Sequence, residues 1–269
     1  MPISEEMVMI PAARRHEIRQ RILEEKTLTV SAVASALGVS EETVRRDFQQ
    51  LEREGVLTRT HGGAIIANRV SPQVTNADLE GILVDAKEAI ARQALMRLSP
   101  RMCVYLDSST TSLTLARKLK VSPVTVVSNS LAILSELSTR SDVQLVGVGG
   151  TLSKTRRCFV GRSAKEMLGN YYFDLVFLSS RSLDLDRGVT DSSDEEIEVK
   201  TTVMQRTNRI ILLADHSKFG RASFSKICDF EDLDDVITDI KPRKDWIDAA
   251  SESNVRISWE NSDSPGIES

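Results

Sequence analysis

The 269-residue sequence has no apolar run that reaches the roughly 18 residues needed for a membrane-spanning helix. The segment from Met1 to Pro11 carries two glutamates and no Lys or Arg ahead of its short apolar patch, so it does not have the pattern of a secretion signal. We therefore expect a globular protein of the cytoplasm that has no membrane partner.

Cysteine and histidine are scarce, with three residues of each type. The cysteines lack the CxxC or Cys/His spacing of a metal site, and the histidines lie in different segments. The sequence therefore predicts free thiols in a reducing compartment, no metal and no cofactor. The residues concerned are Cys103, Cys158, Cys228, His16, His61 and His216.

The net charge is −4, so the chain as a whole lacks the positive charge of many nucleic-acid-binding proteins. The charge is distributed unevenly, however. Residues 14–69 hold ten Lys or Arg and eight Asp or Glu, and the net charge of this part is +2. This distribution permits a nucleic-acid-binding N-terminal part on an acidic body, but the positions of the residues must decide.

Three segments near the N-terminus have apolar residues at helical spacing. Residues 14–25 and 30–37 predict two helices, and Gly38 ends the second. Ser40 is a favourable N-cap for a third helix over 41–54. Two short helices joined by a turn of this length are typical of a helix-turn-helix motif.

The third predicted helix has an apolar side and a polar side. Val44, Phe48 and Leu51 fall together at about 100° per residue and can pack on the other helices. The opposite side carries donors that could read base edges and phosphates in a major groove. We assign to this DNA-binding face Ser40, Thr43, Arg45, Arg46, Gln49, Gln50 and Arg53. An ordinary solvated helix face can have the same composition.

A predicted β-hairpin follows the third helix and favours the DNA-binding interpretation. Residues 56–60 and 64–66 predict two strands, with His61-Gly62-Gly63 as the turn. A hairpin in this position is the wing of a winged helix-turn-helix. Arg59 and His61 could contact backbone phosphates.

The segments 39–48, 51–55 and 59–64 together resemble the signature of DeoR-type bacterial regulators. The resemblance joins a helix motif and a wing motif at the right distance, and it implies double-stranded operator DNA as a partner. Asp47 is unusual on a DNA-binding face. We expect its carboxylate to orient neighbouring arginines rather than to contact DNA.

The stretch after the wing is polar and has no clear period, which is typical of an interdomain connection. The last residues are polar and acidic, and we expect them to be disordered. The predicted organisation is a DNA-binding domain over 1–67, a linker over 68–86, a second domain over 87–260 and a tail over 261–269.

The second domain alternates strand-like and helix-like segments, which predicts an α/β fold with a parallel sheet covered on both faces. The predicted strands are 103–106, 124–127, 143–148, 175–178, 210–214 and 236–238, with a further edge strand at 255–259. The predicted helices are 87–98, 113–119, 131–137, 164–168, 195–205 and 246–251.

Ligands of such sheets bind beyond the carboxyl ends of the strands, and five predicted strands end in polar, small or cationic residues. The first of these ends begins a helix, whose free N–H groups and nearby hydroxyls suit a phosphate. Each cluster alone could be a helix cap or a surface group. The effector-binding residues predicted from these strand ends are Asp107, Ser108, Ser109, Thr110, Thr111, Asn129, Gly149, Gly150, Arg181 and Lys218.

This body also resembles the DeoR-type effector domain, which is similar to sugar-phosphate isomerases such as the ribose 5-phosphate isomerase group. The resemblance adds Lys200 to the predicted effector site. It implies that a phosphate sits on the loop Ser108–Thr111 and that Lys218 supplies a counter-charge.

Two departures from this family pattern bear on the effector. The family commonly has a glycine where Ser109 stands, and glycine-containing sequence where 179–181 stand. A side chain at these positions, where glycine has only a hydrogen, leaves less room for the effector. Arg181 adds a fixed cation that could pair bidentately with a second anionic group.

Three functions remain to be weighed: a ligand-responsive regulator, an active sugar-phosphate isomerase with a DNA-binding head, and a DNA-binding protein without an effector. Asp107, Glu196 and Asp215 could supply the base that isomerisation needs. We favour the regulator and assign no catalytic residue, because a fused DNA-binding head indicates a pocket that senses its ligand.

The resemblance implies a repressor of a carbohydrate-utilisation operon, relieved by a phosphorylated sugar or a related anion. Operators of such systems usually match the two-fold symmetry of the protein, so we expect a dimer or tetramer.

Overall fold

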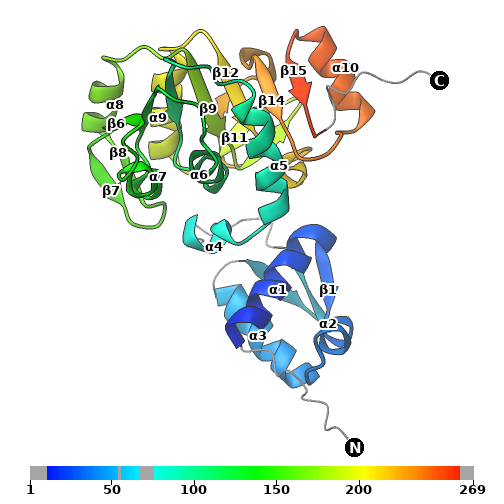
Figure 1. Cartoon of the computed structure of the whole chain (residues 1–269). Coiled ribbons are helices and arrows are strands. Elements are labelled where there is room, and N and C mark those ends of the chain that lie inside the picture. Colours follow the sequence, from blue (N-terminus) through cyan, green and yellow to red (C-terminus); the bar gives the residue numbers. More distant parts are fainter. Residues whose placement is uncertain (1–10, 54–55, 67–75, 261–269) are drawn as a thin grey trace, which may run out of the picture. The chain divides into compact units, whose positions relative to one another are not determined.

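The computed structural model describes residues 11–53, 56–66 and 76–260 (Figure 1). The chain divides into two compact units, Met1–Leu83 and Val84–Ser269. The predicted tail and residues 68–75 of the predicted linker lie outside the described residues. The remainder of that linker contains a short helix, α4 (Asn76–Glu80).

The first unit combines three helices with a small antiparallel sheet. The helices are α1 (Pro11–Glu25), α2 (Val30–Leu37) and α3 (Glu41–Arg53). The strands are β1 (Thr27–Thr29), β2 (Leu57–Thr60) and β3 (Gly63–Ile66), in the order β1-β3-β2. This is the predicted winged helix-turn-helix, with one strand more than predicted.

The turn between α2 and α3 follows from its residues. Thr29 caps α2 by accepting a hydrogen bond from the Ala32 N–H at 3.3 Å. Gly38 ends α2 in the left-handed region at φ +61°, where a side chain would be strained. Ser40 then caps α3 by accepting from the Thr43 N–H at 3.2 Å.

The apolar side of α3 forms the centre of this unit. Val44, Phe48 and Leu51 are fully buried and pack with Ile18 and Ile22 of α1, as predicted. Each such side chain contributes roughly 1.5–3 kcal/mol by leaving water. Packing this face inward directs the polar side of α3 to solvent.

The strand β1 was missed because three residues are too short to show a period. It pairs with β3, and Gly63 lies opposite Thr29. A Cβ on Gly63 would lie 2.3 Å from the Leu28 carbonyl oxygen, so this close pairing requires glycine.

The second unit is built on a seven-stranded parallel sheet with the order β15-β14-β12-β9-β4-β5-β6. Its strands are β4 (Cys103–Leu106), β5 (Val124–Ser128), β6 (Val143–Gly147), β9 (Leu175–Ser179), β12 (Ile210–Leu213), β14 (Asp235–Ile237) and β15 (Arg256–Ser258). The predicted parallel sheet and its late edge strand are confirmed. The chain proceeds from β4 to β5 and β6 on one side, then returns to β9 on the other.

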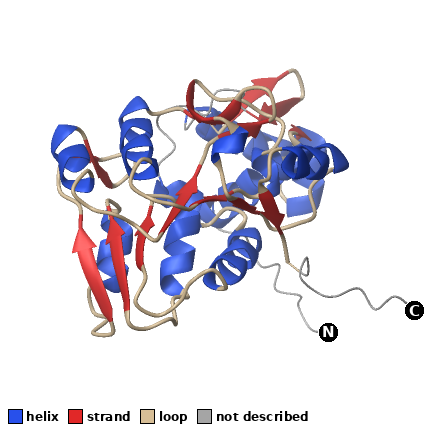
Figure 2. Cartoon of the chain, turned by 90° about the horizontal axis from the view of Figure 1, so that it is seen from above, coloured by secondary structure: helices blue, strands red, loops and turns tan. Residues whose placement is uncertain are grey.

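Helices cover both faces of this sheet (Figure 2). The helices α5 (Val84–Leu95), α6 (Thr110–Arg117) and α7 (Leu131–Leu137) pack on one apolar cluster. The helices α8 (Arg162–Leu168), α9 (Asp194–Met204) and α10 (Lys244–Glu252) pack on the other. Along β4, Val104 and Leu106 belong to the first cluster and Tyr105 to the second, as strand alternation requires.

Two small sheets and two short 3-10 helices, none of them predicted, complete the second unit. The first sheet pairs β7 (Thr151–Ser153) with β8 (Cys158–Val160), and the second contains β10 (Ser182–Asp184), β11 (Gly188–Asp191) and β13 (Ser225–Cys228). The 3-10 helices are η1 (His216–Lys218) and η2 (Phe230–Asp232). No helix in the described ranges is long and apolar enough to cross a membrane.

Candidate functional sites

The outward face of α3 carries several of the predicted DNA contacts. Arg45, Arg46 and Gln49 are exposed, whereas Thr43 and Gln50 are half-buried. Ser40 is committed to the N-cap, where its hydroxyl also lies 2.9 Å from that of Thr43. The side chain of Arg53 lies outside the described part of the structure.

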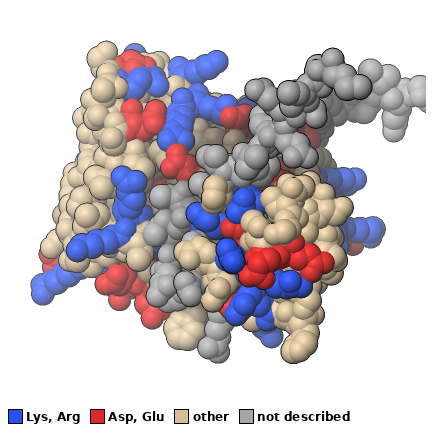
Figure 3. Space-filling view, turned by 90° about the horizontal axis from the view of Figure 1, so that it is seen from below, with Lys and Arg blue, Asp and Glu red and all other residues tan. Residues whose placement is uncertain are grey.

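The arginines of this face are paired with acidic residues of the same helix. Arg45 lies 2.6 Å from Glu41, and Arg46 lies 3.4 Å from Glu42. Both pairs are exposed, and such pairs contribute only about 0.3–0.5 kcal/mol, so a phosphate or base edge can compete for the guanidinium groups. Figure 3 accordingly shows basic and acidic side chains close together rather than a uniform basic patch.

Asp47 has a structural role that sequence reasoning assigned to the wrong partners. Its carboxylate lies 2.5 Å from Arg14 Nε and 3.7 Å from Arg15, both on α1. The adjacent arginines of α3 instead pair with their own glutamates. Asp47 and Arg14 are both buried, so this ion pair fixes α3 against α1.

The wing is the predicted hairpin, formed by β2 and β3. Its basic residue, Arg59, is held in place by Glu52 of α3. Arg59 donates through Nε and its backbone N–H to the two Glu52 oxygens, at 2.6 and 2.9 Å. These bonds lower the pKa of Glu52. His61 lies exposed in the turn, where Gly62 has φ +85°.

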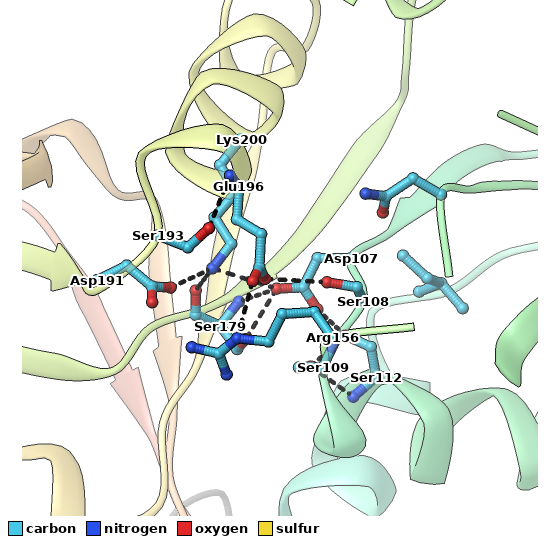
Figure 4. A network of polar contacts seen from close by, with 12 residues as sticks. Asp107, Ser108, Ser109, Ser112, Arg156, Ser179, Asp191, Ser193, Glu196 and Lys200 are labelled. Carbon is cyan, nitrogen blue, oxygen red and sulfur yellow. Dashed lines mark hydrogen bonds and ion pairs between the residues drawn. The ribbon is translucent and has the colours of Figure 1, made fainter. Parts of the chain in front are cut away.

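In the second unit, Asp107 holds together the ends of β4 and β9 (Figure 4). Its carboxylate accepts hydrogen bonds from the Ser109 N–H at 3.1 Å and the Ser112 hydroxyl at 2.6 Å. The N–H and hydroxyl of Ser179 donate to its other oxygen at 2.7 and 2.8 Å. Asp107 is buried and its oxygens are engaged, so it positions the loop that follows β4.

The side chain of Lys200, on α9, lies next to Asp107 and is also bound to protein groups. Its Nζ donates to Asp191 at 2.6 Å and to the Ser179 carbonyl at 2.9 Å, and lies 3.9 Å from Asp107. Burial lowers the pKa of Lys200, but the surrounding carboxylates outweigh burial and raise that pKa above its ordinary value. Lys200 therefore balances two buried carboxylates.

Arg156 is a candidate site residue that sequence reasoning missed. It lies in the turn between β7 and β8, which were not predicted, and its side chain is 14% exposed. Its Nε lies 3.1 Å from a Glu196 oxygen, and its Nη2 donates to the Ser192 hydroxyl at 3.1 Å. Glu196 also accepts from the Ser108 hydroxyl at 3.2 Å, and burial raises the pKa of this glutamate.

The N-terminus of α6 presents two backbone donors. The Ser109 hydroxyl caps the helix by accepting from the Ser112 N–H at 3.0 Å. The N–H groups of Thr110 and Thr111 donate to no residue that the structure describes. Free N–H groups at a helix N-terminus are a favourable place for an anion.

Of the remaining predicted residues, Asn129 is buried, and both its amide oxygen and its amide nitrogen are hydrogen bonded. Its amide accepts from the Tyr105 hydroxyl at 2.8 Å and donates to the Phe159 carbonyl at 2.9 Å. Gly149 and Gly150 follow β6, and a Cβ on Gly150 would lie 2.7 Å from the Val160 carbonyl oxygen. Asn129 and Gly150 thus join the β7–β8 hairpin to the sheet.

Arg181 and Lys218 follow neighbouring strands of the sheet, β9 and β12. The Arg181 backbone N–H donates to the Thr190 carbonyl at 3.0 Å, which fixes the start of its loop. Lys218 Nζ lies 3.9 Å from Asp215. Burial lowers the pKa of Lys218, Asp215 opposes this, and nearby Arg181 lowers that pKa further.

The carboxylates considered for catalysis are each tied to protein groups. Asp215 accepts from the N–H and hydroxyl of Ser217 at 3.0 and 2.5 Å, and so caps the 3-10 helix η1. Asp107 and Glu196 are bound as described above. Within the described residues, no cluster of His, Cys, Asp and Glu has an arrangement that could hold a metal ion.

Comparison with known families accounts for both units. Residues 14–70 match the DeoR-like helix-turn-helix domain, and residues 83–240 match the DeoR C terminal sensor domain. The chain belongs to the DeoR family of transcriptional regulators. The first unit of this DeoR-family chain is therefore a DNA-binding module and the second a sensor.

Full-length relatives are named as regulators. The HTH-type transcriptional regulator GlpR of Haloferax volcanii is 33% identical over 86% of this chain and 91% of that protein. The transcriptional repressor AccR of Agrobacterium fabrum is 32% identical, over 84% and 88%. The L-fucose operon activator of Escherichia coli is 32% identical, over 85% and 95%. This DeoR-family chain is thus a regulator and not an enzyme.

Solved structures align less closely. A ribose 5-phosphate isomerase from Methanocaldococcus jannaschii covers 51% of this chain and 54% of its own length, with 16% identity and a TM-score of 0.38. The assignment rests on the two family matches and the relatives, not on this alignment.

Proposed function

We propose that this regulator binds operator DNA through α3 and the wing, and that a phosphorylated sugar bound to the sensor unit changes its operator affinity. The observation that carries the effector site is the pair of N–H groups of Thr110 and Thr111 at the N-terminus of α6. They lie where a ligand is expected in a sheet of this topology.

That expectation comes from the order of the strands. The chain leaves β4 toward β5 in one direction and later continues through β9 and β12 in the other. The point between β4 and β9 is therefore the topological switch point, where open α/β sheets bind ligands beyond the carboxyl ends of their strands. The loop 107–111 follows β4, and 180–181 follow β9.

The chemistry at this point suits a phosphate. Two N–H groups and the positive end of the α6 dipole favour an anion, and the Thr110 and Thr111 hydroxyls are nearby donors. Lys218 supplies a further positive charge from the end of β12. Asp107, Lys200 and Asn129 hold the surrounding loops in place.

The class of genes that this chain regulates is inferred from the proposed effector and from the names of its relatives. Relatives include an L-fucose operon activator and a transcriptional repressor. We propose a carbohydrate-utilisation operon as the target of this chain, with repression relieved by the effector. We further propose a homo-oligomer that binds a two-fold symmetric operator.

A proline at Thr110 tests the phosphate site directly. Thr110 is the first residue of α6, a position that accepts proline, and Ser109 before it is extended at φ −73°, ψ 158°. Thr110→Pro thus removes one N–H with little effect on the helix. We expect at least about a 10-fold loss of sugar-phosphate affinity, since a charge-assisted hydrogen bond contributes roughly 1.5–3 kcal/mol.

The matched control is Thr110→Val, which removes the hydroxyl but keeps the N–H. Binding is measured by isothermal titration calorimetry with ribose 5-phosphate and other monophosphorylated sugars. If Thr110→Pro binds every sugar phosphate as tightly as the unmodified chain does, the phosphate is not at α6.

A further inference from the structure

The cations around the switch point are unequally partnered. Lys200 is bound between two carboxylates, Arg156 lies beside Glu196, and Lys218 lies near Asp215. The Arg181 guanidinium makes no hydrogen bond or ion pair with any residue that the structure describes. It is partly buried, so water compensates its charge incompletely.

Burial and the nearby charge of Arg156 lower the pKa of Arg181 to about 10. The same two arginines also lower the pKa of Lys218. Asp191, Asp215 and Glu196 act on Arg181 in the opposite direction, so nearby carboxylates oppose its positive charge. The N–H donors of the Arg181 guanidinium still have no acceptor among the described residues. Buried polar groups are usually hydrogen bonded, so these donors are suited to an acceptor from a ligand.

We propose that Arg181, together with Arg156, binds a second anionic group of the effector, separate from the phosphate at α6. The effector would then be a sugar derivative with two anionic groups, a phosphate and either a carboxylate or a second phosphate. This inference rests on the proposed function, because it places both groups on one ligand.

The two arginines come from different elements of the sensor unit. Arg181 follows the end of β9, whereas Arg156 lies in the β7–β8 turn, with its side chain next to Glu196 (Figure 4). Arg156 is oriented by Glu196 and by Ser192, so a guanidinium edge is held in a fixed direction. Planar guanidinium groups match the two oxygens of a carboxylate or phosphate.

The test compares probes with one and two anionic groups on the full chain. The probes are ribose 5-phosphate, fructose 1,6-bisphosphate, 6-phosphogluconate and gluconate, titrated calorimetrically into the unmodified chain, Arg181→Gln and Thr110→Pro. We expect a bisphosphate or phosphorylated sugar acid to bind at least 10-fold more tightly than ribose 5-phosphate. Arg181→Gln should abolish that advantage and change ribose 5-phosphate affinity by less than about 2-fold.

The outcomes separate the two proposals. Equal losses for all phosphorylated probes in Arg181→Gln would mean that Arg181 binds the α6 phosphate, which overturns the second site. Ribose 5-phosphate binding that depends on Thr110, with no advantage for doubly anionic probes, keeps the proposed function and overturns this inference. Gluconate binding that needs Arg181 but not Thr110 supports the arginine site, because gluconate has a carboxylate and no phosphate. 6-Phosphogluconate binding that needs Arg181 but not Thr110 overturns the phosphate site.

The thermal stability of Arg181→Gln shows whether a loss of ligand binding comes from the missing guanidinium or from a damaged fold. Because Arg181 has no protein partner among the described residues, Arg181→Gln should keep or raise the thermal midpoint of the unliganded sensor. A lowered midpoint would indicate that Arg181 stabilises the fold, and would contradict its assignment to a ligand.

Discussion

Replacing Asp47 by alanine should destabilise the DNA-binding unit while leaving its DNA-facing side chains intact. The side chains of Arg14 and Asp47 are 10% and 5% exposed. Removing one partner of a buried ion pair costs about 3–5 kcal/mol. One kcal/mol lowers the melting temperature of a domain of this size by roughly 4–8 °C, so a decrease of at least about 12 °C is expected.

The two tryptophans make this prediction specific to one unit. Trp246 and Trp259 both lie in the sensor unit, and the sequence has no other tryptophan. Thermal unfolding followed by far-UV circular dichroism should show the early transition of the DNA-binding unit. Tryptophan fluorescence should keep its original midpoint, since it reports on the sensor unit alone.

The matched control is Arg45→Ala on the same helix. Its pair with Glu41 has side chains about half exposed, so its loss should cost no more than about 0.5 kcal/mol. A circular dichroism midpoint for Asp47→Ala within about 2 °C of the unmodified chain would refute the reasoning. It would mean that the Arg14–Asp47 pair does not stabilise the packing of α3 on α1.

Two further predictions concern DNA contacts and acid stability. Arg46→Ala should weaken operator binding, measured by fluorescence anisotropy, by roughly 1–3 kcal/mol. The control Arg162→Ala changes another exposed arginine that pairs with an i,i+4 glutamate, on the sensor unit, and it should leave operator binding unchanged. Burial raises the pKa of Asp191, but the positive charge of Lys200 outweighs burial, so this pKa lies below its ordinary value. This stabilisation is present above about pH 4 and is lost as the pH falls through the lowered pKa, so sensor stability followed by tryptophan fluorescence should fall on acidification. Asp191→Asn should make that fall shallower, and an unchanged slope would contradict the assignment.

The elements that could be predicted from sequence are those with a repeating local pattern. The central strands of the sheet are buried on both faces, so they appear as short apolar runs between helices. The helix-turn-helix appears in the spacing of its apolar residues and in the caps at Ser40 and Gly38. Such features depend on residues that are close in the sequence, so they can be predicted without knowledge of tertiary contacts.

The features that were missed depend on contacts between distant segments. The strands β1, β7 and β10 have three residues each, too few to show a period. The partner of Asp47 lies 33 positions away on α1, and nothing in its local sequence identifies Arg14. Arg156 became a candidate only because an unpredicted hairpin places it beside Glu196.

The measurement that tests the central claim most directly is operator affinity with and without effector. An operator is first selected from random double-stranded DNA with the purified chain, and its binding is then titrated by fluorescence anisotropy in the presence of each sugar phosphate. The account predicts that at least one phosphorylated sugar changes operator affinity by about 5–150-fold, and that its unphosphorylated form does not. Operator affinity that stays constant while a sugar phosphate saturates the sensor would contradict it.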